Sequence, residues 1–410
     1  MSKEKWLYTM EVFDGYEKRF ANARVIKEQR FPWENETRDR IIEQTKKMLA
    51  YDARLIPEIK GIEAISKQDC GSFEVTQLKY TTWKNFYGCA SLFMPKTDEK
   101  MPLVFVLCGH GKDGRLSPAY VAMAKRLAEQ GIAVMLPDNI GQGDRIYLGH
   151  RDAIAPFYCG LTLQGLIVME TIALIRYMKK DSRFDSERIG SCGNSGGGTL
   201  NLFLAALAPE LSAISASGYP SEFSYIFSKE KCHCACNLLP GAVHGPEMWE
   251  ILSVFAPKPM LLESGLCDAL IPADYAHRNA RKVGYTYRHL DAANAFRYVS
   301  CNTTHPWANE DRYEIAKFFA EVFSAKAATE EETEALDTSL WHIGIGSESL
   351  TVDSLSERIS GKSTPKGCKL SDVYKPTHNG ELLKPEDIIS DIGRGDVMRI
   401  LAQMECALTV

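Results

Sequence analysis

The sequence lacks the features that mark several large classes of protein. No apolar run approaches the ~20 residues that a membrane-spanning helix needs, and the Met1–Trp6 segment has no apolar core of a signal peptide. The net charge is −5 without any basic stripe, whereas a phosphate-backbone partner requires a basic face. Internal repeats and low-complexity tracts are also missing. The sequence therefore predicts a cytoplasmic protein with neither a membrane nor a nucleic-acid partner.

Cysteine, in contrast, is plentiful, with 12 residues. Disulfide frameworks are typical of short exported chains, whereas this chain has 410 residues and no export signal. Cys108, Cys192 and Cys301 end apolar runs that resemble buried strands, where a free cysteine packs as a small hydrophobe. The cysteines therefore indicate a reducing compartment.

The apolar pattern predicts an α/β protein. Residues 1–72 are polar, with helical spacing of apolar residues from Thr37 to Ala50, and we interpret them as an N-terminal helical extension. Two strand-like runs follow, at 73–80 and 86–94, and then buried strands alternate with helices, which predicts a mostly parallel sheet flanked by helices. Strands are expected at 103–107, 132–136, 188–192, 213–217, 259–263 and 296–300, and helices at 118–130, 161–180, 196–207, from 272 and at 309–323.

Two segments depart from this alternation within a catalytic domain expected at 73–325. Residues 219–257 are interpreted as a lid insertion, and residues 326–410 as a C-terminal appendage that ends in a helical pattern from Lys384 to Ala407. The N-terminal extension either closes the pocket or forms a homodimer contact, and the sequence does not choose between these.

A glycine-rich turn carries the candidate nucleophile. Gly193 to Gly198 contains the pattern G-x-S-x-G around Ser195, directly after an apolar strand and before a helix, as a nucleophile elbow requires. The helix that starts at Gly196 directs its N-terminal N–H groups at the reacting oxygen. The alternative is a turn that only packs the helix against the strand.

A serine hydroxyl needs a base, and the base needs an orienting acid. His305 lies just past a buried strand near the end of the α/β region. This position matches the order Ser, Asp, His along the chain that accompanies a nucleophile elbow. A structural loop histidine is the alternative. Asp268 lies in the turn after strand 259–263 and is the predicted acid, with Glu263 and Asp274 as rivals.

The loop from Cys108 to Lys112 follows the first central strand. Where a nucleophile elbow is present, the oxyanion hole combines the N–H of the residue after the nucleophile, here Gly196, with an N–H from the loop in this position. We expect Lys112, or alternatively Gly111, to donate the second hydrogen bond, and His110 to be a structural hydrogen-bonding residue.

Together these motifs resemble the α/β-hydrolase superfamily over about residues 75–325, and within it the acetyl-xylan-esterase-like and dienelactone-hydrolase-like branches, close to the prolyl-oligopeptidase type. Two positions depart from the family pattern: Thr304 replaces a frequent glycine, and Asp144-Arg145 replaces a usual serine, in loops that border the acyl site. The motifs are His110-Gly111, Asp138 to Arg145, Arg188 to Gly190, Gly193 to Gly197, Gly265 to Pro272 and His305.

The resemblance implies a cofactor-free serine carboxylesterase that acts on a small acyl or acetyl ester, such as one of a carbohydrate or plant-derived compound. An exopeptidase-like amidase is a second hypothesis, but no acidic pair for a substrate amine can be placed. A non-catalytic scaffold is the third, and the complete triad argues against it.

Two features of the lid segment invite interpretation. Tyr219, His244 and Trp249 are expected to line the substrate pocket, with packing of the lid as the alternative. Cys232, Cys234 and Cys236 suggest a metal, but zinc sites usually combine C-x₂₋₄-C pairs from two separate places, and no second pair is nearby in the sequence. We therefore expect a packed segment and no metal.

Overall fold

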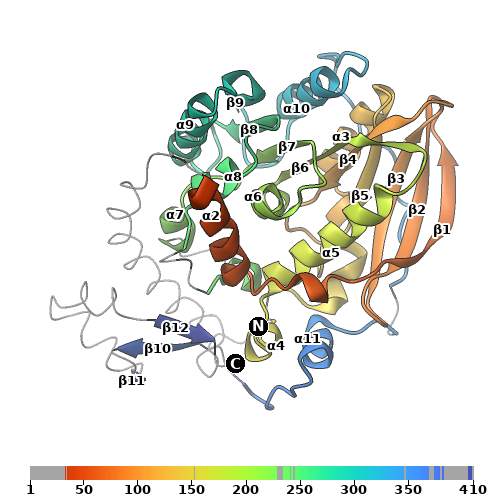
Figure 1. The fold of residues 1–410 in the computed structure, drawn as a ribbon. Helices are drawn as coiled ribbons and strands as arrows, with labels where there is room; N and C mark the ends of the chain where they lie inside the picture. The colour runs from red at the N-terminus through yellow and green to blue at the C-terminus, as the bar shows by residue number, and fades with distance from the viewer. Residues whose placement is uncertain are drawn as a thin grey trace.

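The computed structural model describes residues 33, 35–151, 153–228, 234–240, 242, 245–345 and 348–368, together with three short strands nearer the C-terminus. Its centre is a sheet of nine described strands in the order β1-β2-β3-β5-β4-β6-β7-β8-β9 (Figure 1). The pairs from β1 to β5 are antiparallel and those from β5 to β9 are parallel. The strands are β1 Lys60–Asp69, β2 Phe73–Thr81, β3 Tyr87–Pro95, β4 Met101–Leu107, β5 Ala133–Pro137, β6 Phe184–Asn194, β7 Ala213–Ser217, β8 Met260–Gly265 and β9 Phe296–Cys301.

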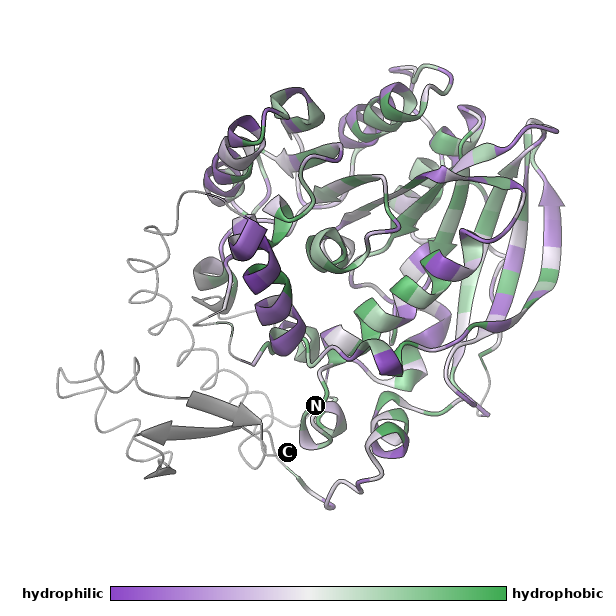
Figure 2. Cartoon of the chain, viewed as in Figure 1, coloured by the Kyte–Doolittle hydropathy of each residue, from purple (hydrophilic) through white to green (hydrophobic). Residues whose placement is uncertain are grey.

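Alternating side chains of the strands fill two hydrophobic cores, one on each face of the sheet. In β4, Leu103 and Phe105 enter the core beneath α5 and α6, whereas Val104 and Val106 enter the core beneath α3 and α10. Figure 2 shows the hydrophobic colours gathered on these central strands. The helices are α2 Asn35–Met48, α3 Pro118–Glu129, α4 Ala155–Tyr158, α5 Leu163–Met178, α6 Gly196–Leu207, α7 Phe223–Ser228, α8 Met248–Ser253, α9 Ala273–His289, α10 Asn309–Phe323 and α11 Val352–Ser360.

The predicted α/β alternation is confirmed, and α2 confirms the helix expected at 37–50. The N-terminal region differs in one respect: residues 60–69, expected within a helical extension, form the edge strand β1. Nearly every residue of β1 is exposed, and the strand is drawn largely in hydrophilic colours (Figure 2). Without one buried face, the strand has no alternating apolar pattern to reveal it.

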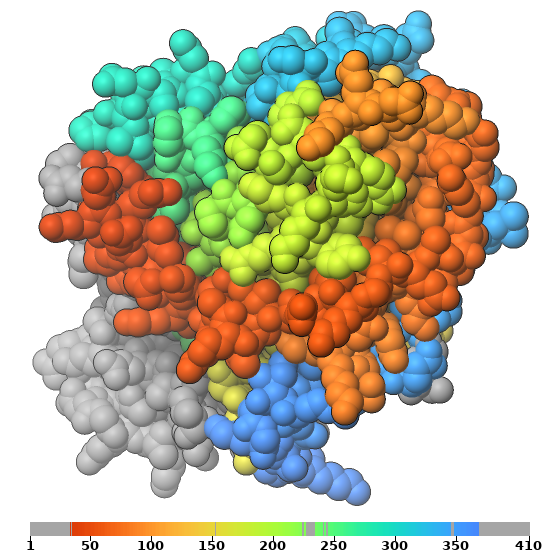
Figure 3. Space-filling model, turned by 45° about the vertical axis from the view of Figure 1, so that its right-hand side comes forward, coloured from red at the N-terminus to blue at the C-terminus, as the bar shows by residue number. Residues whose placement is uncertain are grey.

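The segment after α10 is integrated into the fold rather than appended to it. Trp341 is buried against the sheet, and its Nε1 donates to Oε1 of Gln68 on β1 at 2.7 Å. Helix α11 packs beside α4, where the N–H of Ala155 donates to Asp353 at 3.3 Å. In the space-filling view, α11 (blue) lies beside the N-terminal residues (red to orange) on one face of the molecule (Figure 3).

The predicted helix from Lys384 to Ala407 lies mostly outside the described residues. Its last residues belong to a described strand, β12 Glu405–Leu408, which pairs with β10 Tyr374–His378 next to β11 Glu381–Leu382. Within the described ranges, no helix has the length and apolar character needed to cross a bilayer.

Candidate active site

Ser195 occupies a strained turn between β6 and α6. Its φ of 59° and ψ of −119° lie in a region that non-glycine residues rarely adopt. The surrounding glycines make the turn possible, since a Cβ at Gly197 would clash with the carbonyl of Leu107, and one at Gly193 would lie 2.7 Å from the backbone of Gly197. The N–H of Ser195 donates to the carbonyl of Ser217 at 3.1 Å. The turn thus presents the serine at the carboxyl end of the sheet.

His305 and Asp268 meet at this same edge. Nδ1 of His305 lies 2.8 Å from Oδ2 of Asp268. The other carboxylate oxygen of Asp268 accepts the N–H groups of Leu270 and Ile271 at 2.7 and 2.9 Å, which orients the carboxylate towards the ring. The carbonyl of His305 accepts Nδ2 of Asn194 at 2.8 Å, so the histidine loop is tied to the residue that precedes Ser195.

The two rival acids have other partners. Glu263 is buried in β8, where burial and the neighbouring Asp311 raise the pKa of its carboxyl well above the ordinary value, which favours the neutral form. Asp274 pairs with Arg278 at 2.9 Å on the surface of α9. Asp268 is therefore the carboxylate that the geometry offers to His305.

The loop after β4 packs directly on the elbow. A Cβ at Gly109 would lie 2.8 Å from Cβ of Ser195, and one at Gly196 would lie 2.9 Å from Nδ1 of His110. The N–H of Gly111 donates to Oε1 of Gln142 at 2.8 Å, so this expected alternative oxyanion donor is already engaged. Lys112 lies in the exposed part of the same loop.

His110 has closer neighbours than the sequence suggested. Its Nε2 lies 2.9 Å from Nε2 of His150 and 3.3 Å from Sγ of both Cys234 and Cys236. Burial lowers the pKa of His150 to about 4, which favours its neutral ring. No second pair of ligands is near the cysteines in the sequence, but the fold brings His110 and His150 beside them from distant parts of the chain.

Two of the three residues expected to bind substrate, Tyr219 and Trp249, are buried in the fold. Tyr219 is buried, and its hydroxyl donates to Oδ1 of Asn237 in the lid segment at 3.1 Å. Trp249 is only 4% exposed within the hydrophobic core, which favours the packing alternative over a pocket wall. His244, Cys232 and His233 lie outside the described residues.

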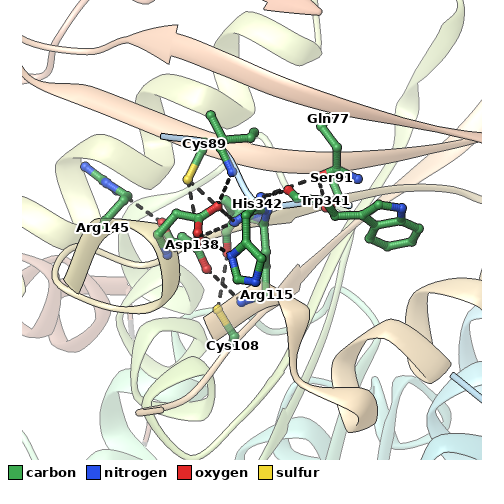
Figure 4. Close-up of polar contacts among 12 residues, drawn as sticks. Gln77, Cys89, Ser91, Cys108, Arg115, Asp138, Arg145, Trp341 and His342 are labelled. Carbon is green, nitrogen blue, oxygen red and sulfur yellow. Dashed lines mark hydrogen bonds and ion pairs between the residues drawn. The ribbon is translucent and has the colours of Figure 1, made fainter. Parts of the chain in front are cut away.

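Buried ion pairs brace the loops that follow β4 and β5 (Figure 4). The Arg115 guanidinium contacts Asp138 at 2.5 Å and Asp144 at 2.9 Å. Arg145 forms two hydrogen bonds with Glu170, at 2.7 and 2.8 Å. The Asp144-Arg145 pair, which departs from the family pattern, is thus committed to these ion pairs, and the side chains anchor the β5 loop.

Asp138→Ala should lower the free energy of unfolding by about 3–5 kcal/mol, because Arg115 would remain buried without its main partner. The matched control is Asp69→Ala, which removes an exposed ion pair with Lys96 and should cost at most about 1 kcal/mol. Urea unfolding of both variants measures the difference. Equal losses would contradict a bracing role for the Arg115–Asp138 pair.

A groove of about 1060 Å³ lies elsewhere, along β1–β3 and residues 95–101. Met101 and Arg183, which line it, lie at the amino ends of β4 and β6. Ligands of open α/β sheets bind at the carboxyl ends of the strands. This groove is therefore separate from the Ser195 edge.

Comparison with known proteins agrees with this fold. Residues 63–232 match the acetyl xylan esterase family. A Bacillus subtilis protein, YtaP, is 23% identical over 211 residues, which cover 51% of this chain and 70% of YtaP. Among solved structures, Methylesterase BT1017 superposes with a TM-score of 0.68 at 18% identity, over 84% of this chain and 78% of that one. A glucuronoyl esterase from Solibacter usitatus superposes with a TM-score of 0.52 at 12% identity, over 69% of this chain and 91% of that one.

Proposed function

We propose that the chain, which has the α/β-hydrolase fold and matches the acetyl xylan esterase family over residues 63–232, hydrolyses carboxylic esters of carbohydrates through an acyl-enzyme on Ser195. The methylesterase and the glucuronoyl esterase among its structural neighbours support an ester as substrate. A small acyl or acetyl ester of a carbohydrate or plant-derived compound is the substrate class that we favour.

The proposed mechanism follows from the arrangement around the elbow. The hydroxyl of Ser195 attacks the ester carbonyl while Nε2 of His305 takes its proton. Asp268 keeps the proton of His305 on Nδ1 and stabilises the imidazolium that forms. The N–H groups of Gly196 and Lys112 hold the oxyanion, aided by the N-terminus of α6. His305 then protonates the leaving alcohol, and water releases the acyl group by the same steps.

The hydrogen bond between His305 and Asp268 carries this proposal. This bond of 2.8 Å connects the loops that follow β8 and β9, and Asn194 links the histidine loop to the strained elbow. A turn that only packed a helix on a strand would need neither the positive φ of Ser195 nor an oriented imidazole beside it. The arrangement therefore favours an active enzyme over a scaffold.

A substrate comparison tests the proposed class. We expect the purified chain to cleave p-nitrophenyl acetate and acetylated xylo-oligosaccharides, with kcat/KM at least about 100-fold above that for an aminoacyl anilide, because the sequence identifies no acidic pair for a substrate amine. The methyl ester of a glucuronoside serves as a matched carbohydrate ester without an acetyl group. Preference for the anilide would indicate an amidase, and no turnover of any substrate would support a scaffold.

We further propose that the enzyme works in a reducing, cytoplasmic setting on a small-molecule ester. Among the described residues, five free cysteines are buried, which suits thiols that pack as hydrophobes: Cys89, Cys108, Cys159, Cys192 and Cys301.

A further inference from the structure

Four potential metal ligands from three segments converge beside the elbow. His110 follows β4, His150 lies in the loop after β5, and Cys234 and Cys236 belong to the lid segment 219–257. Their ligand atoms all lie within 4.8 Å of one another. We propose that these four side chains bind a structural zinc ion that fastens the lid to the oxyanion loop.

The separations fit a tetrahedral ion. Zinc at about 2.0–2.1 Å from nitrogen and 2.3 Å from sulfur implies roughly 3.3 Å between two nitrogens and roughly 3.6 Å between nitrogen and sulfur. The two Nε2 atoms of His110 and His150 are 2.9 Å apart. Nε2 of His110 lies 3.3 Å from each sulfur, and Nε2 of His150 lies 3.6 Å from Sγ of Cys234. These nitrogen–nitrogen and nitrogen–sulfur separations are close to those around one tetrahedral ion, whereas the two sulfur atoms touch each other and would have to move apart to bind it.

The hydrogen bonding of His150 suits a ligand. Its Nδ1 lies 2.7 Å from the carbonyl of Ile140, and a carbonyl can only accept, so Nδ1 carries the proton. Nε2 of the neutral ring then presents its lone pair to the cluster. Metal-bound histidines typically hold their second nitrogen in this way, which fixes both tautomer and ring orientation.

A disulfide is the competing chemistry for the two cysteines, because their sulfur atoms are in contact. The Cys-x-Cys spacing closes a very short loop, and cross-links of short loops restrict the unfolded chain least. A disulfide would also leave both histidine Nε2 atoms facing sulfurs that cannot bind a cation. Zinc accounts for the two thiols and the two imidazoles together.

Four protein ligands complete a tetrahedral shell, so this ion has no open position for water or substrate. Its role would be structural. A Cβ at Gly196 would lie 2.9 Å from Nδ1 of His110, so the cluster adjoins the proposed oxyanion hole. Zinc would therefore hold the lid segment and the loop after β4 in the geometry that catalysis needs.

Metal analysis of the full chain, produced with added zinc and purified under reducing conditions, tests the site without any activity assay. We expect one zinc ion per chain, retained through gel filtration. Cys234→Ser and His150→Ala should each lose it, whereas Cys70→Ser, a free cysteine outside the cluster, should retain it. Chelation of the wild-type protein should lower the melting temperature, and zinc should restore it.

Cobalt substitution of the wild-type protein gives a second readout that does not depend on the folding of variants. Tetrahedral Co²⁺ bound by thiolates should give visible absorption and charge-transfer bands, and these should disappear on addition of zinc. Less than about 0.1 zinc per chain after reconstitution with reductant and zinc, or full retention of zinc in Cys234→Ser, would overturn the proposal. Neither result bears on whether Ser195 hydrolyses esters, so the two proposals fail separately.

Discussion

Ser195→Ala is expected to lower kcat for ester hydrolysis by about 10⁶-fold, because it removes the proposed nucleophile at the end of β6. Binding and the oxyanion donors would leave only a residual acceleration over water of about 10³–10⁴-fold. Steady-state kinetics with p-nitrophenyl acetate measure the loss. Residual activity above about one part in a hundred would contradict the assignment of Ser195.

The same variant should fold normally. Alanine differs from serine by one oxygen atom, and the turn is enforced by the glycines and by the hydrogen bond from the Ser195 N–H to Ser217. Circular dichroism and a thermal melt provide the control. A melting temperature within a few degrees of the wild type would assign the lost activity to chemistry.

His305→Ala should reduce kcat about as strongly as Ser195→Ala, because His305 is the proposed base and the members of a catalytic triad act as a unit. Asp268→Asn should reduce it by about 10⁴-fold through the wrong histidine tautomer. The N–H groups of Leu270 and Ile271 hold one oxygen of residue 268, so the amide NH₂ would face Nδ1 of His305. Nδ1 would then have to accept, and the proton would move to Nε2, where it blocks proton transfer from Ser195.

Asp274→Asn is the matched control, since this carboxylate lies in the first turn of α9 and pairs with Arg278. It should keep near wild-type kinetics. Near wild-type activity of Asp268→Asn, combined with an inactive Glu263→Gln, would show that the acid is Glu263 instead.

The sequence was sufficient for the features that depend on local pattern. Buried strands of the parallel sheet are short apolar runs, and the strand at 188–192 followed by Gly193 to Gly197 indicates an elbow through its glycines alone. The edge strand β1 escaped prediction because it has no buried face.

The parts of the site that depend on tertiary contacts could not be predicted. The cysteines of the lid gave no sign of His110 and His150, which lie 84 to 126 residues away along the chain. An aromatic residue such as Trp249 can line a pocket or pack in a core, so the sequence does not distinguish the two roles. In the structure it packs into the core beneath α9. The roles of Asp144 and Arg145 likewise depend on their ion pairs with Arg115 and Glu170, which are distant in the sequence.

The central claim is an acyl-enzyme on Ser195, and labelling with a fluorophosphonate tests it most directly. Mass spectrometry of the intact chain should show one adduct, and digestion should place it on the peptide that contains Ser195. The adduct should be absent from Ser195→Ala and strongly reduced in His305→Ala, because the base activates the hydroxyl. Stoichiometric labelling of a different residue, or no labelling of a chain that still hydrolyses esters, would contradict the account.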